Sequence, residues 1–185
     1  MTRALVVYES VFGDVKQIAM AIAEGLAARL PVDFACAREA PARVPADVRM
    51  LVVGGPTHAF GPPRPSSPES AIGEHGAEMP DTRFGLHVWL DHVQVPRGLS
   101  AAAFDTRVHH PKLMITLDHA AKTEEKLLRG LGVTLAAPAE HFFITETRGP
   151  LVVGEEDRAH RWGLALGEAV AARPANAHGR PGGFR

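Results

Sequence analysis

The stretch Ala4-Leu5-Val6-Val7-Tyr8-Glu9-Ser10-Val11-Phe12-Gly13-Asp14-Val15 decides the fold class of this chain. Residues 4–7 form a continuous apolar run, which is typical of a strand buried on both faces, as in a parallel sheet. Gly13 then breaks the pattern. After it, apolar residues recur at helical spacing: Val15, Ile18, Ala19, Ile22, Ala23 and Leu26. The stretch therefore predicts a strand, a tight loop and an amphipathic helix.

Strand and helix patterns alternate through the rest of the chain. Strands are expected at 32–36, 50–53 and 101–104, and a fifth at 133–136 and 141–144, interrupted at Pro138. Helices are expected at 84–92, 123–131 and 155–172. The third strand runs into Gly54-Gly55-Pro56, where the chain must turn, and 105–111 is expected as the loop after the fourth strand. The proline-rich residues 61–80 predict an irregular excursion.

This alternation predicts an α/β fold: a doubly wound, five-stranded parallel sheet with helices on both faces, because right-handed crossovers place helices on either side. In such a fold ligands bind beyond the carboxyl ends of the strands, so the loops of interest are 9–14, 54–67, 105–111 and 145–151. We expect one domain over residues 1–172. The segment 173–185 has no apolar periodicity and is expected to be a disordered tail.

Composition excludes several classes of function. A formal charge of −1 gives no net field to recruit nucleic acid or an anionic membrane. The sequence contains no run of 18 or more apolar residues, which a membrane-spanning helix would need. The start of the chain lacks the pattern of a secretory signal. The single cysteine, Cys36, cannot close an intramolecular disulfide, which fits the cytoplasm. We expect a cytoplasmic protein without membrane or nucleic-acid partners.

Neither metal chemistry nor hydrolysis is supported by the motifs. The adjacent pair His109 and His110 has no His-x-x-x-His partner and no cysteine beside it, so no metal site is expected. No Gly-x-Ser-x-Gly elbow follows a strand, so no nucleophile for a Ser/His/Asp hydrolase presents itself.

Three segments together resemble the flavodoxin-like family. Residues 6–15 are similar to the family's phosphate-binding loop between the first strand and the first helix. Residues 52–61, Val-Val-Gly-Gly-Pro-Thr-His-Ala-Phe-Gly, look like the turn that lies against one side of the flavin ring. The third segment has two parts: residues 103–107 resemble the start of the loop over the other side of the ring, and residues 149–151 with 154–155 resemble the approach to the last helix. The resemblance covers about 3–172 and implies the strand order 2-1-3-4-5.

What the resemblance implies is a non-covalent flavin mononucleotide (FMN) site and electron transfer. A phosphate needs N–H groups at a helix N-terminus and hydroxyl donors around them, which Ser10 and the backbone near Gly13 could supply. Candidate walls for the flavin ring are His58, Phe60, Arg107, His109 and His110. The cofactor-binding residues implied are Ser10, Val11, Phe12, Gly13, Asp14, Val15, Pro56, Thr57, His58, Ala59, Phe60, Gly61, Asp105, Thr106, Arg107 and His110.

The first loop departs from the family pattern Ser/Thr-x-Thr-Gly-Asn/x-Thr. It has Phe12 and Val15 where the family has threonines and Asp14 at the usual asparagine, so two hydroxyl donors are absent. A carboxylate about 5 Å from a phosphate would oppose binding by roughly 3 kcal/mol at an effective dielectric of 20, before solvent screening. Alternatively, Asp14 is an N-cap and Gln17, three positions on, completes a capping box.

Two functions therefore stay open. One is an FMN-binding electron-transfer protein or oxidoreductase that works with a redox partner protein or a small-molecule acceptor. The other is a flavin-free interaction or regulatory module that keeps the fold but has lost the phosphate site through Asp14 and Val15. Whether the protein is an enzyme is not decided by these motifs.

Overall fold

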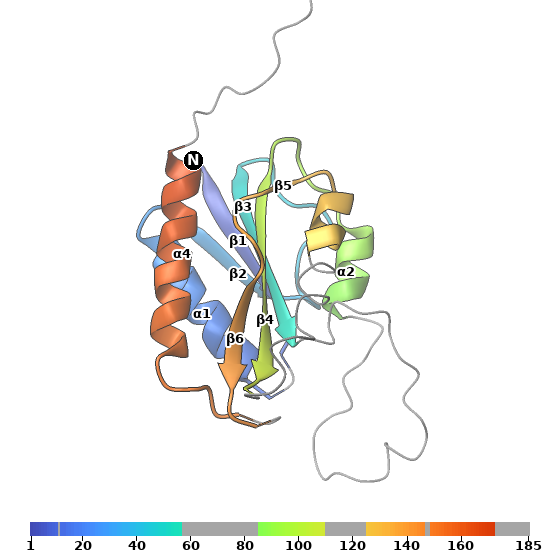
Figure 1. Cartoon of the computed structure of the whole chain (residues 1–185). Helices are drawn as coiled ribbons and strands as arrows, with labels where there is room; N and C mark the ends of the chain where they lie inside the picture. Colours follow the sequence, from blue (N-terminus) through green and yellow to red (C-terminus); the bar gives the residue numbers. More distant parts are fainter. Residues whose placement is uncertain (11, 57–84, 110–124, 147–148, 173–185) are drawn as a thin grey trace, which may run out of the picture.

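Strands and helices alternate along the chain in the computed structural model, which describes residues 1–10, 12–56, 85–109, 125–146 and 149–172 (Figure 1). The strands are β1 (Arg3–Tyr8), β2 (Val32–Cys36), β3 (Val48–Pro56), β4 (Ser100–Val108), β5 (Thr134–Leu135) and β6 (Glu140–Ile144). The helices are α1 (Asp14–Ala27), α2 (Leu86–His92) and α4 (Glu155–Ala171). Residues 125–130 are also helical. The predicted excursion at 61–80 and tail at 173–185 lie outside the described residues.

The described strands form one parallel sheet in the order β2-β1-β3-β4-β5, and β6 also pairs with β4. The fifth position of the sheet is thus shared by two short strands on either side of Pro138, as the sequence predicted. Figure 1 shows α1 and α4 on one face and α2 with the helical residues 125–130 on the other. The predicted doubly wound α/β fold is confirmed.

The predicted end of the fourth strand was wrong. Residues 105–108, expected in a loop, continue β4 and pair with β6, from Asp105 opposite His141 to Val108 opposite Ile144. Polar residues at 105 and 107 look like loop residues in the sequence. In the structure they pair with each other within the strand, so their charges are compatible with burial.

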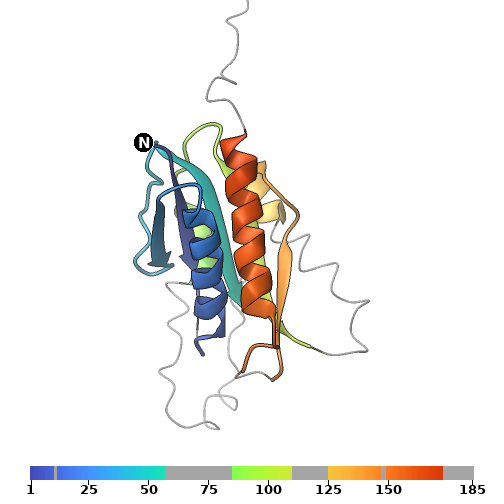
Figure 2. The ribbon, with the colours of Figure 1, turned by 90° about the vertical axis from the view of Figure 1, so that its left-hand side faces the viewer.

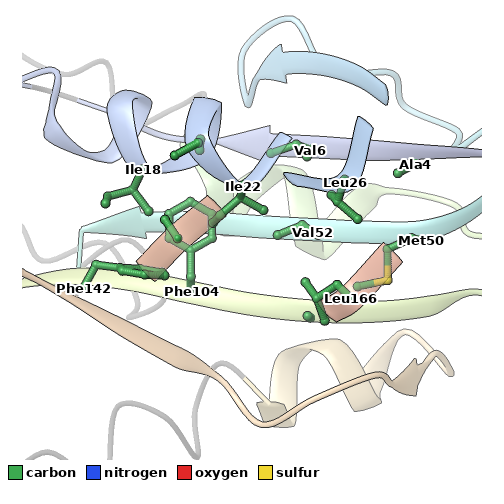
Figure 3. Packing of buried hydrophobic residues seen from close by; sticks show 14 of the residues in the cluster. Ala4, Val6, Ile18, Ile22, Leu26, Met50, Val52, Phe104, Phe142 and Leu166 are labelled. Carbon is green, nitrogen blue, oxygen red and sulfur yellow. The ribbon is translucent and has the colours of Figure 1, made fainter. Parts of the chain in front are cut away.

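Each face of the sheet has its own apolar core. On one face, Ala4, Val6, Met50, Val52 and Phe104 pack against buried residues of α1 and α4. Figure 3 shows side chains of α1 lying over Val6 and Val52. On the other face, alternate residues of the same strands pack against α2, where Trp89 is buried and its indole N–H donates to the Pro41 carbonyl at 3.0 Å. Two-sided burial explains the nearly continuous apolar runs of β1 and β3.

Helices α1 and α4 lie side by side with their backbones in close approach (Figure 2). A Cβ on Gly163 would overlap the carbonyl oxygen of Ile22, and one on Gly25 would overlap that of His160. This contact sets the position of α1, whose first turn lies at the carboxyl edge of the sheet. No helix in the described residues is both long and apolar enough to cross a membrane.

Candidate functional site

The carboxyl ends of β1, β3, β4 and β6 lie at one edge of the sheet, the lower edge in Figure 1. Tyr8, Gly54, Phe104 and Glu140 pair across these four strands in a single row. Two positions beyond the row, Pro56 and Thr106 pair with each other, and the chain continues from Tyr8 into the loop before α1. Three of the predicted binding segments therefore meet at this edge.

Several predicted site residues lie outside the described residues. They are Val11, Thr57, His58, Ala59, Phe60, Gly61 and His110. The described members of the predicted set are Ser10, Phe12, Gly13, Asp14, Val15, Pro56, Asp105, Thr106 and Arg107.

The loop between β1 and α1 is a tight turn closed by Ser10. The N–H of Gly13 donates to the Ser10 Oγ at 3.1 Å, which leaves the hydroxyl hydrogen able to point elsewhere. Gly13 is the N-cap of α1 with a left-handed backbone, φ 102°, and no described atom lies within 4 Å of where its Cβ would project. As at any helix start, the N–H groups of Asp14, Val15 and Lys16 have no acceptor in a preceding turn.

The structure corrects the predicted capping box. Asp14 is the first residue of α1 and not its cap, and no side chain of the described residues caps the helix. Its carboxylate lies against Gly149 in the loop after β6, where a Cβ would overlap the Asp14 Oδ1. Gly149 also has a positive φ of 82°. Both this backbone conformation and the lack of space for a Cβ favour glycine there. The Asp14 side chain therefore packs the loop between β1 and α1 against the loop after β6.

The two other departures from the family loop have different surroundings. Val15 is buried in the core beneath α1. Phe12 has 47% of its surface exposed at the turn.

A buried ionic cluster occupies the α2 face of this edge, and sequence reasoning missed it as a unit. The Nε of Arg107 donates to Asp105 Oδ1 at 2.9 Å, and its Nη2 donates to Oδ2. The Nδ1 of His141 lies 2.9 Å from Asp105 Oδ1 and 2.5 Å from Arg107 Nη2. Asp105 is 0% exposed and Arg107 6%. Alternation along β4 could have placed 105 and 107 on one face, but His141 joins them only through the β4/β6 register.

The row Gly55, Asp105 and His141 crosses three neighbouring strands. On the other side of Gly55, Glu9 follows the last residue of β1. Its N–H donates to the carbonyl of Gly54 at 2.9 Å. The Glu9 carboxylate accepts the N–H of Leu86 at 2.7 Å and so ties the start of α2 to this edge. Gly55 contributes no side chain between these polar groups.

His109, a predicted wall for the flavin ring, is exposed just past the end of β4. Its imidazole makes an edge contact with Phe143, with ring centroids 5.4 Å apart, and its backbone N–H donates to the carbonyl of Ile144. Arg107, another predicted wall, is held in the ionic cluster and does not lie free over a ring. The loop after β6 folds back on that strand, with the Thr145 N–H donating to the carbonyl of Pro150 at 2.9 Å.

Tyr8 ends β1 and stacks on Phe34 of β2, with ring centroids 4.8 Å apart. Burial raises the pKa of its phenol above the ordinary value near 10, and the charges of Cys36 and Glu39 add to the shift. Since the unfolded chain would lose this proton first, we expect stability to fall as the pH rises above about 10. Tyr8 is the only tyrosine, so ultraviolet absorbance reports its titration directly. A midpoint at or below that of the urea-unfolded chain would contradict the expected shift.

Several solved flavodoxins have the same arrangement of strands and helices as this chain. A flavodoxin from the domain Archaea superposes with a TM-score of 0.57 at 18% identity, covering 92% of this chain and 99% of that one. Oxidised Flavodoxin 2 from Bacillus cereus gives 0.60 at 14% identity, over 90% and 99%. A cysteine-to-serine mutant of flavodoxin from Pseudomonas aeruginosa gives 0.59 at 17% identity, over 92% and 100%.

The chain has a flavodoxin-like fold. No protein-family model matches the sequence, and no curated protein matches it. At identities below 20% the flavodoxin-like fold is what the likeness establishes, so the binding residues are argued from this chain alone.

Proposed function

We propose that this protein binds FMN at the carboxyl edge of its sheet and transfers electrons in the cytoplasm to a redox partner protein or a small-molecule acceptor. The observation that carries the proposal is the turn from β1 into α1. There a left-handed Gly13 and a serine hydroxyl precede a helix start at the edge where ligands of open α/β sheets bind.

The residues of this turn fit a phosphate group. First-turn N–H groups and the positive end of the helix dipole favour an anion at the start of α1. Ser10 accepts from Gly13 and can still donate its own hydroxyl hydrogen. Open space beside Gly13, as far as the described residues extend, leaves the backbone accessible. The Asp14 carboxylate opposes an anion, but its place against Gly149 gives that acid a role in joining two loops.

The ends of β3 and β4 would hold the flavin ring. Pro56 and Thr106 end neighbouring strands, and Gly55 lets the backbone come close to a planar group because it has no side chain. Bound there, FMN would supply one- or two-electron chemistry, and the chain's own residues would orient the ring and restrict water. A formal charge of −1 gives the protein no strong field for steering partners, so partner choice would depend on local contacts.

Titration of the purified chain with FMN, followed by quenching of flavin fluorescence, tests the proposal. We expect saturable binding at micromolar concentrations or tighter. Asp14→Asn should strengthen FMN binding by about tenfold, because it removes a partly screened like charge near the phosphate. Lumiflavin, the same ring without the phosphate, should bind both proteins equally.

Asp157→Asn is the matched control, since Asp157 is an exposed acid in the first turn of α4. It should leave FMN affinity unchanged. Absence of saturable binding at hundreds of micromolar in both the parent chain and Asp14→Asn would reject FMN as the ligand and favour a flavin-free module.

A further inference from the structure

Arg107 carries a buried hydrogen-bond donor that no partner in the described part of the chain satisfies. Its side-on pairing with Asp105 uses Nε and Nη2, and His141 Nδ1 lies beside the same Nη2. The remaining nitrogen, Nη1, is buried and has no hydrogen-bond partner among the residues that the structure describes. An unmet buried donor on a charged group is unfavourable, so it calls for an explanation.

The cluster holds this nitrogen in a fixed orientation. Two hydrogen bonds to a carboxylate that is itself 0% exposed lock the plane of the guanidinium. His141 closes the side toward β6, and its side chain is 24% exposed. Nη1 is therefore preorganised before any ligand arrives, which is the condition under which a hydrogen bond contributes most to affinity.

The charge of the cluster selects the kind of acceptor. Asp105 and Arg107 already balance each other, so this pair has no spare positive charge for an anion at Nη1. An uncharged carbonyl oxygen adds no charge and accepts a hydrogen bond from a guanidinium well. A carbonyl group is thus the acceptor that fits a neutral, buried pair.

We infer that Arg107, through Nη1, donates a hydrogen bond to a carbonyl oxygen on the pyrimidine part of the flavin ring. The inference rests on the proposed function, because it is the proposed FMN site that brings a planar ring with two such carbonyls to the end of β4. Arg107 is then a cofactor-orienting residue that acts in the plane of the ring and not by stacking on its face. The ring is recognised separately from the phosphate, which binds at α1.

Binding of FMN and of lumiflavin to Arg107→Lys tests this assignment. Lysine keeps the positive charge beside Asp105. It lacks the planar guanidinium, which can donate hydrogen bonds to the carboxylate on one side and to a ligand on the other. We expect both flavins to bind about tenfold more weakly, by the same factor, because the lost contact is to the ring they share. The infrared stretch of a ¹³C-labelled ring carbonyl in the bound flavin should also move to higher frequency.

Arg3→Lys is the control, because Arg3 pairs with Asp33 and Asp47 at the opposite edge of the sheet. It should change neither affinity nor the carbonyl stretch. If Arg107→Lys does not fold, the double variant Asp105→Asn/Arg107→Gln removes both charges together and should give the same equal loss.

Three outcomes would overturn the inference. Unchanged affinity for both flavins would show that Arg107 makes no hydrogen bond to the ring. A loss of affinity for FMN but not for lumiflavin would show that Arg107 acts on the phosphate and not on the ring. An unmoved carbonyl stretch would make Arg107 a purely structural residue. If the unmodified chain binds neither flavin, the proposed function itself fails and this inference with it, which is distinct from a chain that binds flavin without Arg107.

Discussion

Gly163→Ala is expected to lower the free energy of unfolding by about 3 kcal/mol, at the upper end of what overpacking costs in a well-packed core. The added methyl group would overlap the Ile22 carbonyl oxygen and lie 2.9 Å from its carbon. Both atoms belong to the backbone of α1, so relief requires the two helices to separate. Gly25→Ala should have a similar effect, because its Cβ would overlap the His160 carbonyl oxygen and lie 2.7 Å from the Leu164 nitrogen.

Urea unfolding measures this effect, and Gly130→Ala is the matched control. Gly130 is a helical glycine with no described atom within 4 Å of its Cβ position. Alanine there should leave stability unchanged or raise it by up to about 1 kcal/mol, through helix propensity and a less flexible unfolded chain. Equal effects at 130 and 163 would mean that the close approach of α1 and α4 is not what requires glycine.

The order and class of the elements could be predicted from the sequence because each buried strand is a local pattern. The apolar runs 4–7 and 50–53 and the helical spacing after Val15 depend on neighbours only a few residues away. The true end of β4 could not be predicted in this way. Asp105 and Arg107 are polar, and only their mutual pairing and the ladder to β6 make a strand there favourable.

The geometry of the candidate site could be predicted only as far as local sequence signals reach. The position of the turn at Ser10 and Gly13 follows from a strand, a glycine and a helix in succession. The role of Asp14 did not follow, because its neighbour Gly149 is 135 positions away and comes close only in the folded chain. His141 was missed for the same reason, since its contact with Asp105 is set by cross-strand register.

Arg107→Met should be the most damaging change in the ionic cluster. It takes the bidentate donor away from the fully buried Asp105 carboxylate, and breaking a buried pair from one side costs about 3–5 kcal/mol. His141 Nδ1 lies 2.9 Å from Asp105 Oδ1 and donates to it in the tautomer that carries a hydrogen on Nδ1, so we expect the lower end of that range. Urea unfolding of the single variant beside Asp105→Leu/Arg107→Met measures the effect, and the double variant should recover most of the loss.

Recovery in the double variant would bear on why the pair exists. When two buried charges can be replaced together by apolar side chains with little change in stability, they are not needed to hold β4 in the sheet. Their presence is then explained by the donor they orient, the Nη1 of Arg107, which lacks a partner in the described part of the chain. If instead the double variant is as unstable as the single one, the cluster itself is required for the fold. The orientation of Nη1 would then follow from packing and would not indicate selection for a ligand.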